Sequence, residues 1–146
     1  MKIKETYKTK EKIMNNSLTE EQVKVLNMSQ SVINEVRKVI IGKDEIIIKV
    51  LLSILAGGHI LIEDIPGVGK TTLAVALSKA LSLDYKRLQF TPDVLPTDVT
   101  GFTILNKETH KFEYKQGAAL TNLFLADEIN RTSSKTQSAL LEVMEE

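Results

Sequence analysis

Several residue types that would mark out a class of function are absent or scarce in this chain of 146 residues. There is no cysteine, which excludes disulfide bonds and thiolate metal sites and is compatible with a reducing cytosol. Aromatic residues make up only 5%, and 19 basic side chains are balanced by 19 acidic ones. No net positive field therefore favours nucleic acid or a membrane surface, and a basic face with interleaved aromatics is not expected.

Long apolar runs are missing as well. The longest apolar stretch, 46–62, is interrupted by lysine, serine, glycine and histidine, so no run of about 20 apolar residues is present to span a membrane. Residues 1–16 are rich in lysine and lack an apolar centre, which argues against a secretory signal and predicts a mobile basic tail. We therefore expect a cytoplasmic protein without membrane insertion, in which residues 17–146 form one folded unit.

A glycine-rich segment holds the most informative pattern in the chain. It reads Asp64-Ile65-Pro66-Gly67-Val68-Gly69-Lys70-Thr71-Thr72. Glycines allow a backbone to wrap an anion with its N–H groups pointing inward. In such a loop the lysine reaches the β- and γ-phosphates of a nucleotide, and the threonine after it ligates Mg²⁺. The usual pattern has glycine where this chain has Asp64, so a plain glycine-rich turn is the alternative.

The surroundings of this segment favour the phosphate-binding reading. The apolar run 59–62 precedes it and predicts a buried strand. Apolar residues then recur at helical spacing, at Leu73, Leu77, Ala80 and Leu81, which predicts an amphipathic helix. Strand, glycine loop and helix are the context that a phosphate-binding loop requires, and the helix N-terminus adds partial positive charge.

A second pattern lies at the end of an apolar run, 122–126, which predicts another buried strand. The run ends in Asp127 and Glu128. Carboxylates at the C-terminal end of such a strand lie where α/β sheets bind ligands. Asp127 would then hold the hydration shell of Mg²⁺ and Glu128 would polarise the attacking water. The alternative is an acidic pair that only ends the strand and caps the next element.

The remaining chain predicts further elements. Ser17 and Glu20 fit a capping box that opens a helix to about Val39, and a largely buried helix follows over 44–56. A short strand is expected at 87–90, a turn-rich connection at 91–101, and a helix capped at 134–137 near the end. Residues 102–105 and 111–114 flank a polar turn and predict a β-hairpin. The helix residues expected to face inward are Val25, Met28, Val32, Val36 and Val39 in the first helix and Ala139, Leu140, Val143 and Met144 in the last.

Three phrases resemble the MoxR family of AAA+ ATPases. They are GHILIEDIPGVGKT from Gly58, LQFTPDVLPTDVTG from Leu88, and LADEINR from Leu125 with KTQSALLE from Lys135. The resemblance implies an α/β fold, a three-layer αβα P-loop NTPase core with a mostly parallel sheet and a hairpin inserted over 101–117. Aspartate at the position of Asp64 is a familiar variant in that family, whereas Gln often stands where this chain has Lys43, and Pro-Pro where it has residues 133 and 134.

The resemblance also implies cofactors and site residues. ATP and Mg²⁺ are the expected cofactors, with Lys70 and the loop amides on the phosphates, Thr71 and Asp127 on the metal and Glu128 on the water. Ile41 and Gly42 are expected beside the adenine. Asn130 and Arg131 are placed either at a subunit interface or in a surface turn that caps the last helix, two readings that stay equally open.

Family members are expected to form hexameric rings that remodel client proteins, including proteins with von Willebrand A-type domains. The chain ends at Glu146, before the family's sensor, arginine finger, helical lid and one central strand. We therefore expect ATP hydrolysis from the intact protein and little or none from these residues alone. The alternatives are a truncated, non-hydrolysing nucleotide-binding module and, with less support, a nucleic-acid motor.

Overall fold

The computed structural model describes residues 18–63, 65 and 67–145. The expected basic tail 1–16, Ser17 and the candidate site residues Asp64 and Pro66 lie outside the described residues. The elements in chain order are α2 (Glu20–Arg37), α3 (Asp44–Leu55), α4 (Lys70–Ala80), β1 (Tyr85–Gln89), α5 (Pro96–Thr100), β2 (Gly101–Leu105), β3 (Phe112–Gln116), β4 (Leu123–Asp127), the 3-10 helix Ile129–Arg131 and α6 (Ser134–Glu145).

Helices α2, α3 and α4 share one apolar core. Apart from Ile40, which follows α2, its members come from one face of each helix, because residues three or four apart on a helix lie on the same side. Ile47 and Leu77 are almost completely buried, at 0% and 1% exposure. The buried set is Ile33, Val36, Ile40, Ile47, Val50, Leu51, Leu73 and Leu77. This core fixes α4, and with it the glycine-rich loop, against the rest of the chain.

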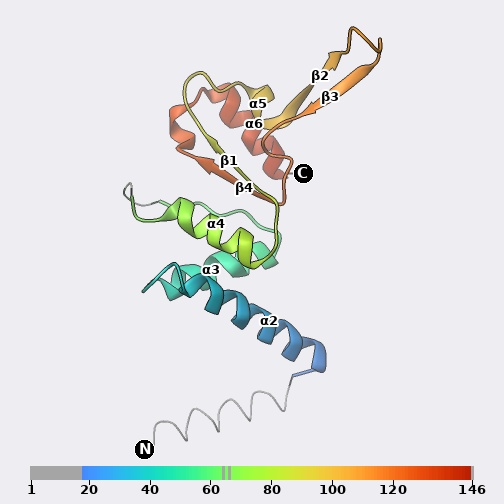
Figure 1. Cartoon of the computed structure of the whole chain (residues 1–146). Helices are drawn as coiled ribbons and strands as arrows, with labels where there is room; N and C mark the ends of the chain where they lie inside the picture. Colours follow the sequence, from blue (N-terminus) through green and yellow to red (C-terminus); the bar gives the residue numbers. More distant parts are fainter. Residues whose placement is uncertain (1–17, 64, 66, 146) are drawn as a thin grey trace, which may run out of the picture.

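A second core forms around the strands. β1 and β4 run parallel, with Gln89 opposite Asp127 in the register. Phe90, Val99 and Leu140 form the buried centre between this sheet and the helices α5 and α6. Figure 1 shows α5 and α6 on one side of the sheet and α4, α3 and α2 on the other. The sheet is therefore covered by helices on both faces, as a parallel sheet requires.

The strands β2 and β3 form an antiparallel hairpin, with Gly101 opposite Gln116 and Leu105 opposite Phe112. The hairpin projects away from the two cores (Figure 1). At its base Tyr114 donates a hydrogen bond to the Thr100 carbonyl, and Ala119 N–H bonds to the Val99 carbonyl. The expected α/β class, parallel pairing and inserted hairpin are all confirmed.

The prediction of a strand at 59–62 is wrong. Residues 58–63 are not in a strand, and Leu61 is 70% exposed, although Ile62 packs against the core of α2, α3 and α4. A strand needs a hydrogen-bonded neighbour. Within the described ranges the strand pairs are β1 with β4 and β2 with β3, and the segment 58–63 pairs with none of them.

Two helix caps differ from the predictions. The capping box of α2 is formed by Thr19 and Gln22, whose side chains bond to each other's backbone N–H at 3.3 and 2.9 Å. In α6 the Ser133 hydroxyl accepts from the N–H of Thr136, so the cap lies one residue before the expected Ser134. Both differences follow from competition between neighbouring hydroxyl residues, all of which suit an N-cap.

The predicted buried faces of three helices were partly wrong. Val25, Met28 and Val39 of the first predicted helix are 56%, 61% and 59% exposed, while Ile33 and Val36 are buried. Helix α3 is not largely buried, because Leu52 and Leu55 remain 60% and 55% exposed and only one face contacts the core. In α6, Ala139 and Leu140 are buried as expected, whereas Met144 is 39% exposed. No helix in the described part of the chain is long and apolar enough to cross a membrane.

Candidate functional site

The glycine-rich loop leads directly into α4. Gly67 and Gly69 have φ angles of +86° and +90°, in the left-handed region where residues with a side chain are strained. A Cβ atom at either position would meet no atom of the described residues within 4 Å. Gly69 is the N-cap of α4. The loop therefore combines an unusual backbone with open space beside it, as an anion-binding turn at a helix N-terminus requires.

The polar side chains of the loop belong to the first turn of α4, which begins at Lys70. The Lys70 ammonium donates to the carbonyl of Ile65 at 3.5 Å, a long contact across the loop. Thr71 and Thr72 follow in the same turn, where the backbone N–H groups of a helix have no partner within the helix. The phosphate-binding role of these residues stays a prediction.

The segment expected beside the adenine is joined to the loop by a direct contact. Ile41 is 86% exposed and Gly42 has a φ of +75°. The next residue, Lys43, donates from its ammonium to the Val68 carbonyl at 2.9 Å. The structure thus brings the segment 41–43 against the glycine-rich loop. Sequence reasoning noted Lys43 only as a departure from the family and did not predict this contact.

Asp127 ends β4 at the C-terminal edge of the parallel sheet. Arg87 of β1 donates to its Oδ2 atom twice, from Nε at 3.1 Å and from Nη2 at 2.7 Å. The side chains are 41% and 22% exposed, so the ion pair is half-buried. Arg87 was missed as a site residue. The signal was a charged side chain inside a short strand, two residues before that strand's C-terminal end.

Glu128 occupies a strained backbone position. Its φ and ψ angles are 56° and 46°, in the left-handed region, and it is the N-cap of the 3-10 helix. The Arg131 side chain donates to its Oε2 atom at 2.6 Å. Left-handed backbone at a residue with a side chain is uncommon and concentrates at functional sites. The contact holds the Arg131 side chain against the Glu128 carboxylate. A subunit interface at Asn130 and Arg131 stays a prediction.

The available ligands suit magnesium. No cluster of three or more His, Cys, Asp or Glu that could hold a metal is found in the described ranges. Mg²⁺ does not require one, because it is usually bound by one or two protein oxygens together with water and substrate phosphates. The Thr71 hydroxyl and the Asp127 carboxylate are oxygen ligands of that kind. They fit Mg²⁺ only as the partner of a bound phosphate chain.

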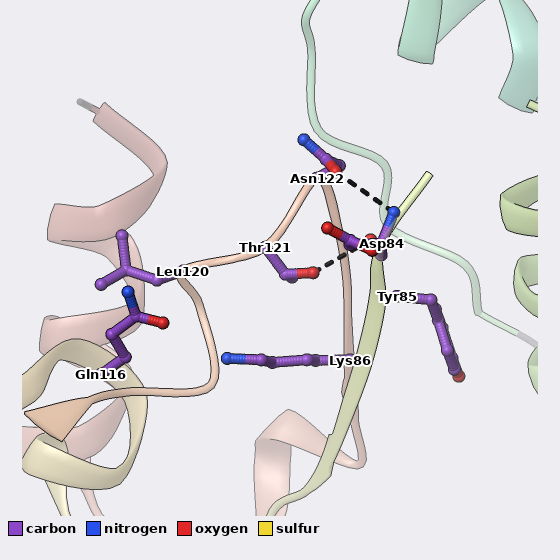
Figure 2. A pocket seen from close by; sticks show the side chains of 7 residues that line it. All are labelled: Asp84, Tyr85, Lys86, Gln116, Leu120, Thr121 and Asn122. Carbon is purple, nitrogen blue, oxygen red and sulfur yellow. Dashed lines mark hydrogen bonds between the residues drawn. The ribbon is translucent and has the colours of Figure 1, made fainter. Parts of the chain in front are cut away.

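A separate pocket lies at the other end of the sheet. It has a volume of about 600 Å³ and lies at the start of β1 and β4. Figure 2 shows Thr121 and Asn122 bonded to the backbone of Asp84, while Tyr85 points away from them. These bonds tie the two strand beginnings together. The pocket does not include the glycine-rich loop or the acidic residues.

A parallel sheet with helices on both faces, a left-handed glycine loop opening α4 and two carboxylates at a strand end define a P-loop nucleotide-binding protein. The model of the ATPase family associated with various cellular activities (AAA) matches residues 59–146. The chain belongs to that family, and its named relatives place it with the MoxR proteins.

Three relatives illustrate the similarity. The chain is 56% identical over 114 residues to the uncharacterised protein YeaC of Bacillus subtilis, covering 78% of this chain and 36% of the relative. It is 42% identical to Chaperone MoxR1 of Mycobacterium tuberculosis, covering 77% and 30%. A solved structure from Cytophaga hutchinsonii, described as a candidate ATPase, superposes with a TM-score of 0.71 at 47% identity, covering 82% and 36%. The chain therefore spans about a third of the length of these relatives.

Proposed function

We propose that the chain binds ATP with Mg²⁺ and provides the phosphate-binding and water-activating residues of a MoxR-type ATPase. The observation that carries the proposal is the pair of left-handed glycines, Gly67 and Gly69, with open space where a side chain would begin. An anion can approach the backbone closely only where no Cβ stands in the way. The start of α4 adds a partial positive charge at the same place.

Each residue has a separate task in this proposal. The loop amides and the Lys70 ammonium bind and orient the phosphates. The Thr71 hydroxyl and the Asp127 carboxylate would hold the metal, which supplies charge neutralisation on the phosphates when it is bound. Glu128 orients and polarises the attacking water, and the hydrogen bond from Arg131 fixes the direction of its carboxylate. Ile41 and Gly42 would contact the base.

We propose that ATP hydrolysis drives the remodelling of client proteins by a hexameric ring. The support is membership of the AAA family and the similarity to a relative named Chaperone MoxR1. Clients with von Willebrand A-type domains remain part of the proposal through the family resemblance alone. A cytoplasmic location remains part of it through the absence of cysteine and the lysine-rich residues 1–16. A nucleic-acid motor is disfavoured by the balanced charge of the chain.

A second candidate is a nucleotide-binding module that does not hydrolyse ATP. The observation that favours it is that both candidate carboxylates already have arginine partners, Arg87 on Asp127 and Arg131 on Glu128. If these pairs persist when nucleotide binds and hold the two carboxylates away from the phosphates, the metal and the attacking water cannot reach them. Binding would then continue without turnover.

Two measurements made in parallel distinguish the ATPase from the non-hydrolysing module. Binding of a fluorescent ADP analogue is titrated with Mg²⁺ present, and phosphate release from ATP is followed in parallel. Lys70→Ala should lose binding, whereas Glu128→Gln should bind and lose turnover. Lys49→Ala serves as the matched control, because Lys49 is exposed on α3 and forms an ion pair with Glu45 one turn away.

Each outcome has a clear meaning. Turnover that disappears in Glu128→Gln supports the ATPase, and binding without turnover in the unmodified protein supports the second candidate. A protein that binds no nucleotide contradicts both. Turnover that rises strongly when DNA is added would support a nucleic-acid motor instead.

A further inference from the structure

Lys43 makes a contact that the proposed reaction does not use. Its ammonium reaches across 25 residues of sequence to the Val68 carbonyl, at 2.9 Å and in a partly buried position. Val68 lies between the two left-handed glycines of the loop. A lysine ammonium on its long flexible side chain normally remains in solvent. The partly buried contact therefore restrains both the Lys43 side chain and the Val68 peptide unit.

The Val68 carbonyl and the Gly69 N–H belong to the same peptide unit. A peptide bond is planar and trans, so the C=O of Val68 and the N–H of Gly69 point in opposite directions. By holding the carbonyl, Lys43 turns the Gly69 N–H to the opposite side of the loop. That N–H donates no backbone hydrogen bond to any described residue. The glycines on both sides of Val68 would otherwise let this peptide unit rotate.

We propose that Lys43 is a positioning residue that aims the Gly69 N–H at the bound phosphates. The assignment of a phosphate as the acceptor rests on the proposed function, whereas the orientation of the peptide unit does not. Lys43 follows Gly42 directly and is the N-cap of α3. Its contact with Val68 therefore also connects residues 41–42, which are expected beside the adenine, to the loop. Its charge adds to the positive potential that favours an anion beside the loop.

The test compares ligands that differ in their number of phosphates. In Lys43→Met the side chain stays unbranched and only one atom shorter, but it cannot donate a hydrogen bond. We expect ADP and ATP to bind about tenfold more weakly, the loss that corresponds to one hydrogen bond to a charged partner, while adenosine binds as before. Lys43→Arg should restore most of the affinity, and Lys49→Met should change nothing. Equal losses for adenosine and ADP, or no loss for ADP, would overturn the proposal.

A measurement without ligand separates this proposal from the proposed function. In NMR spectra of the ligand-free protein, the Val68 carbonyl carbon and the Gly69 amide should shift in Lys43→Met. Both signals should stay near their original positions in Lys43→Arg and Lys49→Met. If the unmodified protein binds no nucleotide, the proposed function fails while these shifts still support the orientation by Lys43. Unchanged signals in Lys43→Met would refute the orientation even where nucleotide binds.

Discussion

Replacing Gly69 with alanine should weaken nucleotide binding much more than it destabilises the fold. Gly69 adopts a φ of +90°, and a Cβ placed there would meet no atom of the described part of the chain within 4 Å. The substitution therefore causes no collision with the described residues. The methyl group would instead occupy the open space beside the loop, which the proposed function assigns to a phosphate.

The two effects can be estimated separately. Left-handed backbone costs a residue with a side chain about 1–2 kcal/mol. For a chain of this size, 1 kcal/mol lowers the melting temperature by roughly 3–5 °C. Blocking the approach of a phosphate to the loop removes one or two hydrogen bonds to a charged group, each contributing about 1.5–3 kcal/mol. Nucleotide affinity should then fall by about 10-fold to more than 100-fold.

A matched control is available at Gly57. It has a φ of +65°, and a Cβ there would also meet no atom within 4 Å, but it lies at the end of α3 away from the loop. Gly57→Ala should lower the melting temperature by a similar amount and leave the dissociation constant of Mg-ADP unchanged. Thermal melts and fluorescence titrations of both variants provide the comparison. Equal ADP affinities in Gly69→Ala and the unmodified protein would refute the assignment of the open space to a phosphate.

Three further predictions concern stability. Leu77→Ala, at a side chain only 1% exposed, should cost about 2–5 kcal/mol in denaturant unfolding, whereas Leu52→Ala, 60% exposed, should cost far less. Burial raises the pKa of Tyr85 above its ordinary value of 10.0, so the folded state keeps the phenol proton to higher pH and stability should fall above about pH 10. Tyr85→Phe should remove that loss and cost little at neutral pH, because the buried hydroxyl has no hydrogen-bond partner in the described part of the chain. Gly101→Ala should cost more than about 2 kcal/mol, since its φ is +97° and a Cβ would lie 2.5 Å from the Lys115 carbonyl oxygen; a near-neutral result would contradict the close packing at the hairpin base.

Much of the fold could be predicted because its signals are local. The positions of α3 and α4 follow from apolar residues at helical spacing, and the hairpin follows from two short apolar runs around a polar turn. The failures concern burial and pairing. Val25 and Met28 match a helical period but lie on a part of α2 that the core does not reach. Periodicity shows that a helix has an apolar face, whereas the neighbours decide how much of that face is covered.

In the candidate site, too, the local features could be predicted and the long-range contacts could not. The loop, Lys70 and Thr71 are adjacent in sequence, so their chemistry could be read from one short segment. The partners Arg87 and Lys43 could not, because they contact residues 40 and 25 positions away. Such contacts depend on which strands pair and where a loop packs. They determine how Asp127 and the glycine loop are held.

The sequence by itself determined the class of site, since the left-handed glycines and the first turn of α4 depend on neighbouring residues alone. It also determined the family, through phrases that match along most of the chain. Only the tertiary structure decided that 59–62 pairs with no strand among the described residues, that Arg87 pairs with Asp127, and that Lys43 holds the Val68 carbonyl. The physical reason is distance along the chain: backbone conformation, helix capping and the Glu128–Arg131 pair are set within a few residues. Strand pairing and the contacts of Arg87 and Lys43 form only when remote segments pack together.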